Sequence, residues 1–169
     1  MKVVKELAPV SVTEKTDGRF IVDFGQNLTG WMRFSVRGAR GQTVRLRYAE
    51  SLDENGELFT ANLRSAKAEG LYTLRGGERE TYEPAFTYYG FRFVEVSGYP
   101  GQCDPSDFTA CMVSDDMRTV GSFKTSDELL NRIYRNAWWG IAGNYKGMPV
   151  DCPQRNEKQP WLGDRGVAA

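Results

Sequence analysis

The residues best suited to chemistry lie close together near the end of the chain, from Asp151 to Arg165. This segment contains three carboxylates, two arginines, one lysine and one tryptophan. Pro153 and Pro160 cannot supply interior helix hydrogen bonds, so the segment is predicted to be a loop or a very short helix. Acids interleaved with bases beside a large aromatic ring suit a pocket that binds a polar, ring-shaped ligand. A solvated surface loop is the alternative interpretation.

The composition excludes several other catalytic chemistries. The chain contains no histidine, which removes Ser-His and Cys-His nucleophile pairs and histidine-containing zinc sites within it. Cys103, Cys111 and Cys152 are odd in number and lack CxxC spacing. Buried free thiols are therefore predicted, rather than a disulfide framework or a zinc site. We expect no metal and no cofactor, which leaves carboxylates, cationic side chains and aromatics as the groups for chemistry.

Charge and hydropathy narrow the possible partners. Lys plus Arg and Asp plus Glu both number 22, so the formal net charge is zero. Nucleic acid and anionic membranes attract a basic excess, so neither is an expected partner. The sequence lacks the run of roughly 20 apolar residues that a membrane span needs, and residues 1–6 lack the apolar core of a secretory signal. The compartment stays undetermined, because a longer parent protein can carry a signal upstream.

Alternating apolar and polar residues predict β-strands from the start of the chain to residue 113. The pattern is clearest over residues 43–50, where Val44, Leu46 and Tyr48 are predicted to face inward between outward-facing arginines. Such alternation is typical of half-buried antiparallel strands. Further strands are expected at residues 20–24, 31–37, 71–74, 86–96 and 108–113. About eight short strands separated by turns predict a mainly β fold, an antiparallel two-sheet β-sandwich.

A helical pattern replaces the strands after residue 116. Thr125 and Glu128 have the spacing of a capping box, in which Thr125 caps the first turn and Glu128 reaches back to its amide. Apolar residues at three- and four-residue spacing then predict an amphipathic helix over residues 126–143.

The apolar stripe of this helix sets a requirement for the rest of the fold. We predict core packing for Leu130, Ile133 and Tyr134, whereas the adjacent Trp138 and Trp139 cannot both face the same core. A single helix with such a stripe needs partners. It either packs back on the sandwich or is the first helix of a second, all-α domain.

Several separated segments carry a recognisable pattern. They are Asp-Cys-Pro-Gln-Arg-Asn-Glu-Lys at 151–158 with Trp-Leu-Gly-Asp at 161–164, Val-Asp-Phe-Gly-Gln-Asn-Leu-Thr-Gly-Trp at 22–31, Arg-Tyr-Ala-Glu-Ser-Leu-Asp at 47–53, Asn-Leu-Arg-Ser-Ala-Lys at 62–67 and Tyr-Tyr-Gly-Phe-Arg at 88–92. In this order and spacing they resemble the bacterial α-L-rhamnosidases, the family 78 glycoside hydrolases. The resemblance covers nearly the whole chain.

This resemblance implies a domain layout. Residues 1–9 would be a linker from a missing upstream domain, and residues 10–113 a concanavalin-like, jelly-roll β-sandwich. Residues 114–169 would be the N-terminal fragment of an (α/α)6 catalytic barrel, with one long helix and a loop. The remainder of that catalytic domain would be missing from this chain.

The same resemblance implies hydrolysis of terminal α-L-rhamnosyl bonds with inversion, on a rhamnose-containing glycan or glycoside. Inversion needs a general acid and a base whose carboxyl groups are roughly 6.5–9.5 Å apart. Glu157 matches the acid of the family, and Asp151 and Asp164 match positions that hydrogen-bond sugar hydroxyls. Trp161 would form an apolar wall, and Arg155 would order the carboxylates of this binding set. The base of the family lies downstream of residue 169, so the fragment alone is expected to be inactive.

One departure and two alternatives accompany this hypothesis. Asn156 stands where many family members have Asp, which removes one negative charge beside the expected acid. A non-catalytic carbohydrate-binding sandwich is one alternative, with Trp31, Tyr88 or Tyr89 stacking on a sugar. A structural sandwich is the other, which braces the barrel and shapes the substrate cleft with residues 51–70, where the strand pattern fails.

Overall fold

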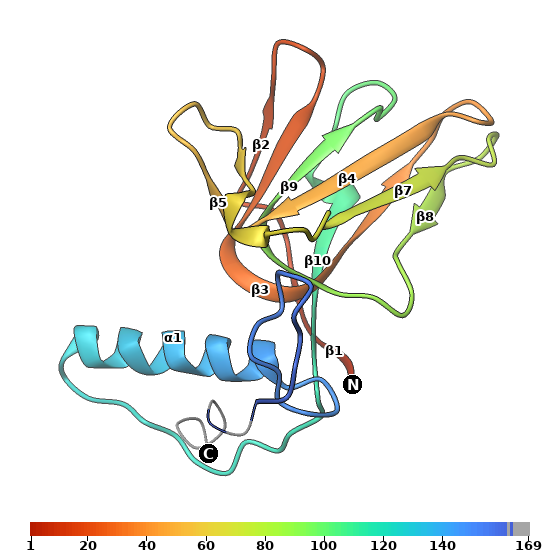
Figure 1. The fold of residues 1–169 in the computed structure, drawn as a ribbon. Coiled ribbons are helices and arrows are strands. Elements are labelled where there is room, and N and C mark those ends of the chain that lie inside the picture. Colours follow the sequence, from red (N-terminus) through yellow and green to blue (C-terminus); the bar gives the residue numbers. More distant parts are fainter. Residues whose placement is uncertain (162, 164–169) are drawn as a thin grey trace.

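The computed structural model describes residues 1–161 and 163 (Figure 1). Within these residues a mainly β unit precedes one α-helix. The elements are β1 (Lys2–Leu7), β2 (Ser11–Glu14), β3 (Phe20–Val36), β4 (Thr43–Ala49), β5 (Ser51–Leu52), β6 (Leu58–Phe59), η1 (Ala61–Leu63), β7 (Glu69–Thr73), β8 (Glu80–Tyr82), β9 (Tyr89–Ser97), η2 (Pro105–Asp107), β10 (Phe108–Ser114) and α1 (Glu128–Asn144).

Strand β3 organises the sheet because it pairs with four other strands. Its first part pairs with β2 and β9, and its last part pairs with β10 and β8. The register with β9 shifts between Asp23 and Leu28, where the strand bends (Figure 1). Gly25 lies in this bend at φ +71°, a conformation that glycine adopts without a side-chain clash. The sequence predicted a turn here that ends a strand at Phe24, which is wrong, because the chain continues through the bulge.

The eight-stranded antiparallel sheet runs β1-β10-β3-β9-β4-β7, with β2 and β8 also paired to β3. Since the two ends of β3 carry different neighbours, the sheet curls around one core and its two layers share this strand. The predicted mainly β, concanavalin-like antiparallel fold is confirmed. The inward positions predicted from the alternation, Val44, Leu46 and Tyr48, are all buried, and so are Met32, Phe34 and Val36 of β3.

The first residues of the chain belong to the sheet. Residues 1–9 are expected as an interdomain linker, but Lys2–Leu7 form strand β1 and pair with β10. Lys2 lies opposite Ser114, and Leu7 lies opposite Ala110. The open edge of β10 offers unpaired backbone groups, and β1 satisfies them. Residues 2–7 are therefore a strand of this sheet, and the expected origin of residues 1–9 as a linker from an upstream domain stays a prediction.

Helix α1 begins two residues later than predicted. Its N-cap is Asp127, whose Oδ1 accepts hydrogen bonds from the amides of Leu129 and Leu130 at 2.8 and 3.4 Å. The predicted capping box is absent: the Thr125 amide donates to Asn131 Oδ1 at 2.8 Å instead of to Glu128. Asp and Thr are both good N-caps, so the spacing alone did not decide between them.

Only the C-terminal end of α1 packs on the sheet. Ala142 and Gly143 are buried there, whereas Leu130, Ile133 and Tyr134 are 46, 55 and 41 % exposed. The prediction of core packing for these three residues is wrong within this chain. Helix α1 lies below the β unit with much of its length apart from it (Figure 1). Among the described residues, no helix combines the length and apolarity that crossing a bilayer requires.

Candidate active site

The segment from Asp151 to Trp161 is an irregular loop, as predicted, and we call it the motif loop. Two hydrogen bonds close it at its ends. The Asp151 amide donates to the Gln159 carbonyl at 3.0 Å, and the Gln159 amide donates to Asp151 Oδ1 at 2.8 Å. Lys158 turns the backbone between them with φ +49°, which a non-glycine residue rarely adopts. The loop therefore folds back on itself between Asp151 and Gln159.

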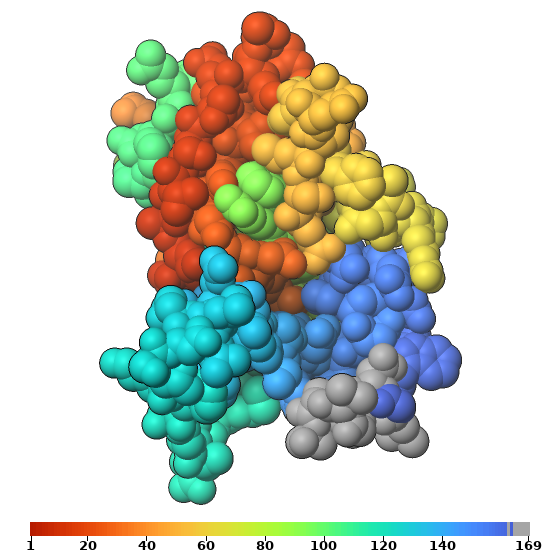
Figure 2. Space-filling model, turned by 90° about the vertical axis from the view of Figure 1, so that its left-hand side faces the viewer, coloured from red at the N-terminus to blue at the C-terminus, as the bar shows by residue number. Residues whose placement is uncertain are grey.

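The β unit holds this loop through direct contacts. Lys158 Nζ donates to the Tyr88 carbonyl at 2.8 Å and lies 4.1 Å from the centroid of the Tyr88 ring. Gly90 of β9 packs against the Gln154 backbone so closely that a Cβ at position 90 would lie 2.8 Å from Gln154 Cβ. In Figure 2 the blue motif loop lies directly against the yellow segment around residue 60.

Glu157 occupies the centre of the motif loop, with its side chain 26 % exposed. Its Oε2 accepts hydrogen bonds from Arg155 Nε at 2.9 Å and Arg155 Nη2 at 2.7 Å. The same oxygen accepts from Arg64 Nη1 at 3.2 Å. Its other oxygen, Oε1, accepts from Trp161 Nε1 at 3.3 Å. The structure thus brings three predicted site residues together, namely Arg155, Glu157 and Trp161.

Asp151 lies beside this group but is largely enclosed, with its side chain 8 % exposed. Burial alone would raise its pKa, but hydrogen bonds from the Cys152 thiol at 3.0 Å and from the Gln159 amide outweigh burial and lower the pKa. Arg155 Nη2 lies 3.6 Å from Asp151 Oδ2. Asp151 is therefore a carboxylate at neutral pH, and both of its oxygens accept hydrogen bonds from residues of its own loop.

Asp151, Cys152 and Glu157 have the spacing of a possible metal site, because one potential ligand atom from each lies within 4.8 Å of the others. The Arg155 guanidinium contacts both carboxylates and supplies positive charge at this place. Burial raises the pKa of the Cys152 thiol, which disfavours a thiolate ligand. Cys152 and Cys111 are buried free thiols, as predicted, and Cys103 is a partly buried one.

An open cleft of about 610 Å³ lies beside the motif loop. Its lining includes Asp151, Arg155, Glu157 and Trp161. Trp161 is 54 % exposed and stands at the rim. A cleft of this size, with charged groups and one indole ring, accommodates a monosaccharide. Asp164, the remaining predicted site residue, lies outside the described residues.

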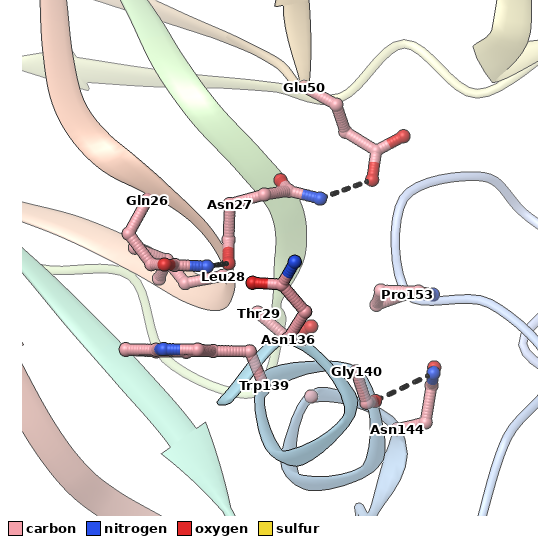
Figure 3. Close-up of a pocket in the computed structure, with 11 residues that line it drawn as sticks. Gln26, Asn27, Leu28, Thr29, Glu50, Asn136, Trp139, Gly140, Asn144 and Pro153 are labelled. Atoms are coloured by element: carbon pink, nitrogen blue, oxygen red, sulfur yellow. Dashed lines mark hydrogen bonds between the residues drawn. The ribbon is translucent and has the colours of Figure 1, made fainter. Parts of the chain in front are cut away.

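A second hollow of about 390 Å³ lies between the bend of β3 and helix α1 (Figure 3). Asn27 donates to Glu50 Oε1 at 2.9 Å on one side of it, and Asn136 and Trp139 of α1 line the other. Asn144 Oδ1 is buried without a hydrogen-bond partner among the described residues. Residues 22–31 stand out in the sequence as a motif, but the sequence does not predict this hollow, because the hollow forms only where the β3 bend meets the helix.

The aromatics proposed for sugar stacking are engaged within the protein. Trp31 Nε1 donates to Glu83 at 2.9 Å, and Lys158 covers the Tyr88 ring. Tyr89 stacks on Tyr48 with ring centroids 4.1 Å apart. These contacts remove the observation that favoured a carbohydrate-binding face built from Trp31, Tyr88 and Tyr89.

A curled antiparallel β unit is followed by one helix and by a loop that lines an acidic cleft, which is the arrangement of a β domain joined to the opening of a helical domain. Residues 13–114 match the bacterial alpha-L-rhamnosidase concanavalin-like domain, and residues 118–169 match the bacterial alpha-L-rhamnosidase 6 hairpin glycosidase domain. The chain therefore belongs to the bacterial α-L-rhamnosidase family.

Individual relatives agree with this assignment. An alpha-L-rhamnosidase of Streptomyces avermitilis is 44 % identical over all 169 residues, which make up 16 % of that protein. A crystal structure of the S. avermitilis alpha-L-rhamnosidase complexed with L-rhamnose superposes with a TM-score of 0.94 over 98 % of this chain and 16 % of that one. The alpha-L-rhamnosidase structure from Dictyoglumus thermophilum gives a TM-score of 0.96 at 39 % identity, covering 98 % of this chain and 19 % of that one. This chain thus spans less than one fifth of these relatives.

Proposed function

We propose that this chain is part of an inverting α-L-rhamnosidase that releases terminal α-L-rhamnose from a glycan or glycoside. Glu157 is the general acid in this proposal. The observation that carries it is the position of Glu157 in the cleft beside Trp161, in a chain 44 % identical to a protein whose structure contains L-rhamnose. Asp151, Arg155, Trp161 and Asp164 form the binding set in the proposal.

The two described carboxyl groups in the cleft divide into different roles. A general acid must carry a proton to the glycosidic oxygen. The lowered pKa of Asp151 keeps that group ionised at neutral pH, so it cannot donate. Glu157 Oε2 is held by three N–H donors, which leaves Oε1, beside Trp161, as the oxygen that can carry the proton.

The base of the reaction is not Asp151. An inverting pair needs roughly 6.5–9.5 Å between carboxyl groups, because a water molecule must fit between base and sugar. Ligand oxygens of Asp151 and Glu157 lie within 4.8 Å of each other, which is too close. We therefore propose that the base comes from a part of the parent protein outside this segment, and that the segment alone does not hydrolyse rhamnosides. In the same proposal residues 10–113 form the sandwich domain and residues 114–169 open the catalytic barrel.

The test is Glu157→Gln in the full-length parent protein, assayed on two rhamnosides that differ in the acidity of the leaving group. Loss of a general acid lowers the rate by about 10²–10⁴-fold, and the loss should be largest for an alkyl rhamnoside, whose leaving group needs the proton most. A 2,4-dinitrophenyl rhamnoside should be much less affected. Exposed Glu54, changed to Gln, is the matched control. Wild-type kcat/KM of the Glu157 variant on both substrates would rule out this role.

A further inference from the structure

We propose that Arg64, a residue of the β unit, is a positioning residue that selects which oxygen of Glu157 carries the catalytic proton. The inference rests on the proposed role of Glu157 as general acid. It extends that role to a side chain of the sandwich, outside the motif loop and outside the predicted binding set.

The contact is long-range in the sequence and direct in space. Arg64 Nη1 lies 3.2 Å from Glu157 Oε2, and the two residues are 93 positions apart. Next to this pair, Asn156 Nδ2 donates to Ser65 Oγ at 2.7 Å. Adjacent residues of one segment thus contact adjacent residues of the other, as Figure 2 shows for the two surfaces. Arg155 also holds Glu157, but it moves with the motif loop, whereas Arg64 ties the carboxyl group to the β unit.

The backbone of Arg64 supports a specific task. Its φ of 56° and ψ of −118° lie in a region that residues with a side chain rarely adopt. Such conformations persist only where the surroundings enforce them, and they gather at functional sites. Here the neighbouring Leu63 side chain is buried, and the Ala66 amide donates to the Leu63 carbonyl at 3.1 Å. The segment is fixed on its buried side, and the unusual turn directs the arginine to the motif loop.

The chemistry of the pair follows from the permanent charge of arginine. A guanidinium does not release its proton in proteins, so Arg64 is neither acid nor base. It donates to Oε2 together with Arg155, so that the transferable proton is on Oε1. In the acid step this proton moves to the glycosidic oxygen while the bond from that oxygen to the anomeric carbon breaks, with its electron pair going to the oxygen; a water molecule forms the new bond to that carbon from the opposite face and gives its proton to the base. The carboxylate left on Glu157 then faces two guanidinium groups, which stabilise the new charge.

The experiment compares Arg64→Ala, Arg64→Lys and Ser65→Ala in the full-length parent protein on the same two rhamnosides. We expect Arg64→Ala to lower kcat on the alkyl rhamnoside by about 10–10²-fold, the range for a misplaced catalytic group, and to change kcat on the dinitrophenyl rhamnoside less than about threefold. Guanidinium ion should restore part of the lost activity of Arg64→Ala. Lysine should restore only part, because an ammonium is a point charge without the planar fork.

Ser65→Ala tests whether the effect comes from the position of the Glu157 carboxyl group or only from the attachment of the motif loop to the β unit. It removes the neighbouring contact to Asn156 without touching Glu157, so any effect should be the same on both substrates. An equal loss on both substrates for Arg64→Ala, or no loss, would overturn the inference while leaving Glu157 as acid. If Glu157→Gln itself shows no dependence on the leaving group, the proposed function fails first and the inference fails with it. Thermal unfolding of each variant detects a change in folding.

Discussion

Gly90 offers a steric test of how the β unit places the motif loop. This glycine lies in strand β9 next to Tyr89. A Cβ added there would lie 2.8 Å from Gln154 Cβ and 3.0 Å from both Gln154 Cα and Gln154 N. These atoms belong to the backbone and the root of a side chain, so they cannot rotate away. Gly90→Ala therefore has to displace the motif loop, the strand, or both.

The size of the effect follows from these distances. Carbon atoms in contact prefer separations of about 3.5–4.0 Å, so relief of the 2.8 Å contact requires a shift on the order of 1 Å. Overpacking of this kind costs about 1–3 kcal/mol. Because Gln154 lies three residues before Glu157 in the same loop, the shift is expected to reach this proposed general acid. A misplacement of about 1 Å can lower the rate about 10²-fold, which corresponds to about 2.7 kcal/mol in the activation free energy.

Two assays check this expectation. Hydrogen exchange should show faster exchange for the Asp151 and Gln159 amides, whose bonds close the loop, and kcat/KM of the full-length parent should fall about 10²-fold. Gly70→Ala is the matched control, because it also lies in a strand of this sheet and its Cβ would meet only the Tyr89 hydroxyl, at 3.9 Å. Wild-type exchange and wild-type kcat/KM for Gly90→Ala would refute the close packing of the loop on β9.

Two lysines give further predictions. Lys158→Met removes the hydrogen bond to the Tyr88 carbonyl and the cation–π contact. It also removes the cost of burying the ammonium, so we expect the free energy of opening the motif loop to fall by only about 1–2 kcal/mol. Limited proteolysis should cut the loop about 5–30-fold faster than in a control variant with the exposed Lys124 changed to Met, and equal rates would contradict the contact. Burial lowers the pKa of Lys146 to about 8 from an ordinary 10.5. Between these two pH values the unfolded chain therefore binds more protons than the folded one, and the free energy of unfolding should rise with pH by up to about 3 kcal/mol. Urea unfolding at several pH values should show this rise, and Lys146→Met should reduce it; the same slope in both proteins would contradict the burial.

Strand β4 and the last part of β3 could be predicted because one face of each is buried, which imposes a two-residue period that is visible in the sequence. The bend in β3 could not, since the register shift at Leu28 depends on pairing with β9. Strand β1 was missed for a related reason. Its apolar residues, Val3, Val4 and Leu7, do not alternate with its charged ones, and only the distant edge of β10 makes the segment a strand.

The site shows the same division between local and long-range information. Arg155, Glu157 and Trp161 could be grouped from the sequence because they lie within one loop. Arg64 and Gly90 could not be given roles, because their contacts join segments far apart in the chain. The only signal was that residues 62–67 and 88–92 belong to the segments that resemble the rhamnosidases, which indicated importance without indicating what these residues touch.

The long-range contacts also explain why a glycosidase loop would need the sandwich. Two backbone-linked hydrogen bonds between Asp151 and Gln159 close the motif loop, and they leave the residues between them free to vary. Fixing each such residue costs about 1–2 kcal/mol of conformational entropy, while catalysis requires positioning within about 0.5 Å. Strand β9 limits the loop from one side through Gly90, and Arg64 donates a hydrogen bond to the Glu157 carboxyl group from the other. The sandwich thereby supplies the second and third fixed points that a short loop cannot provide by itself.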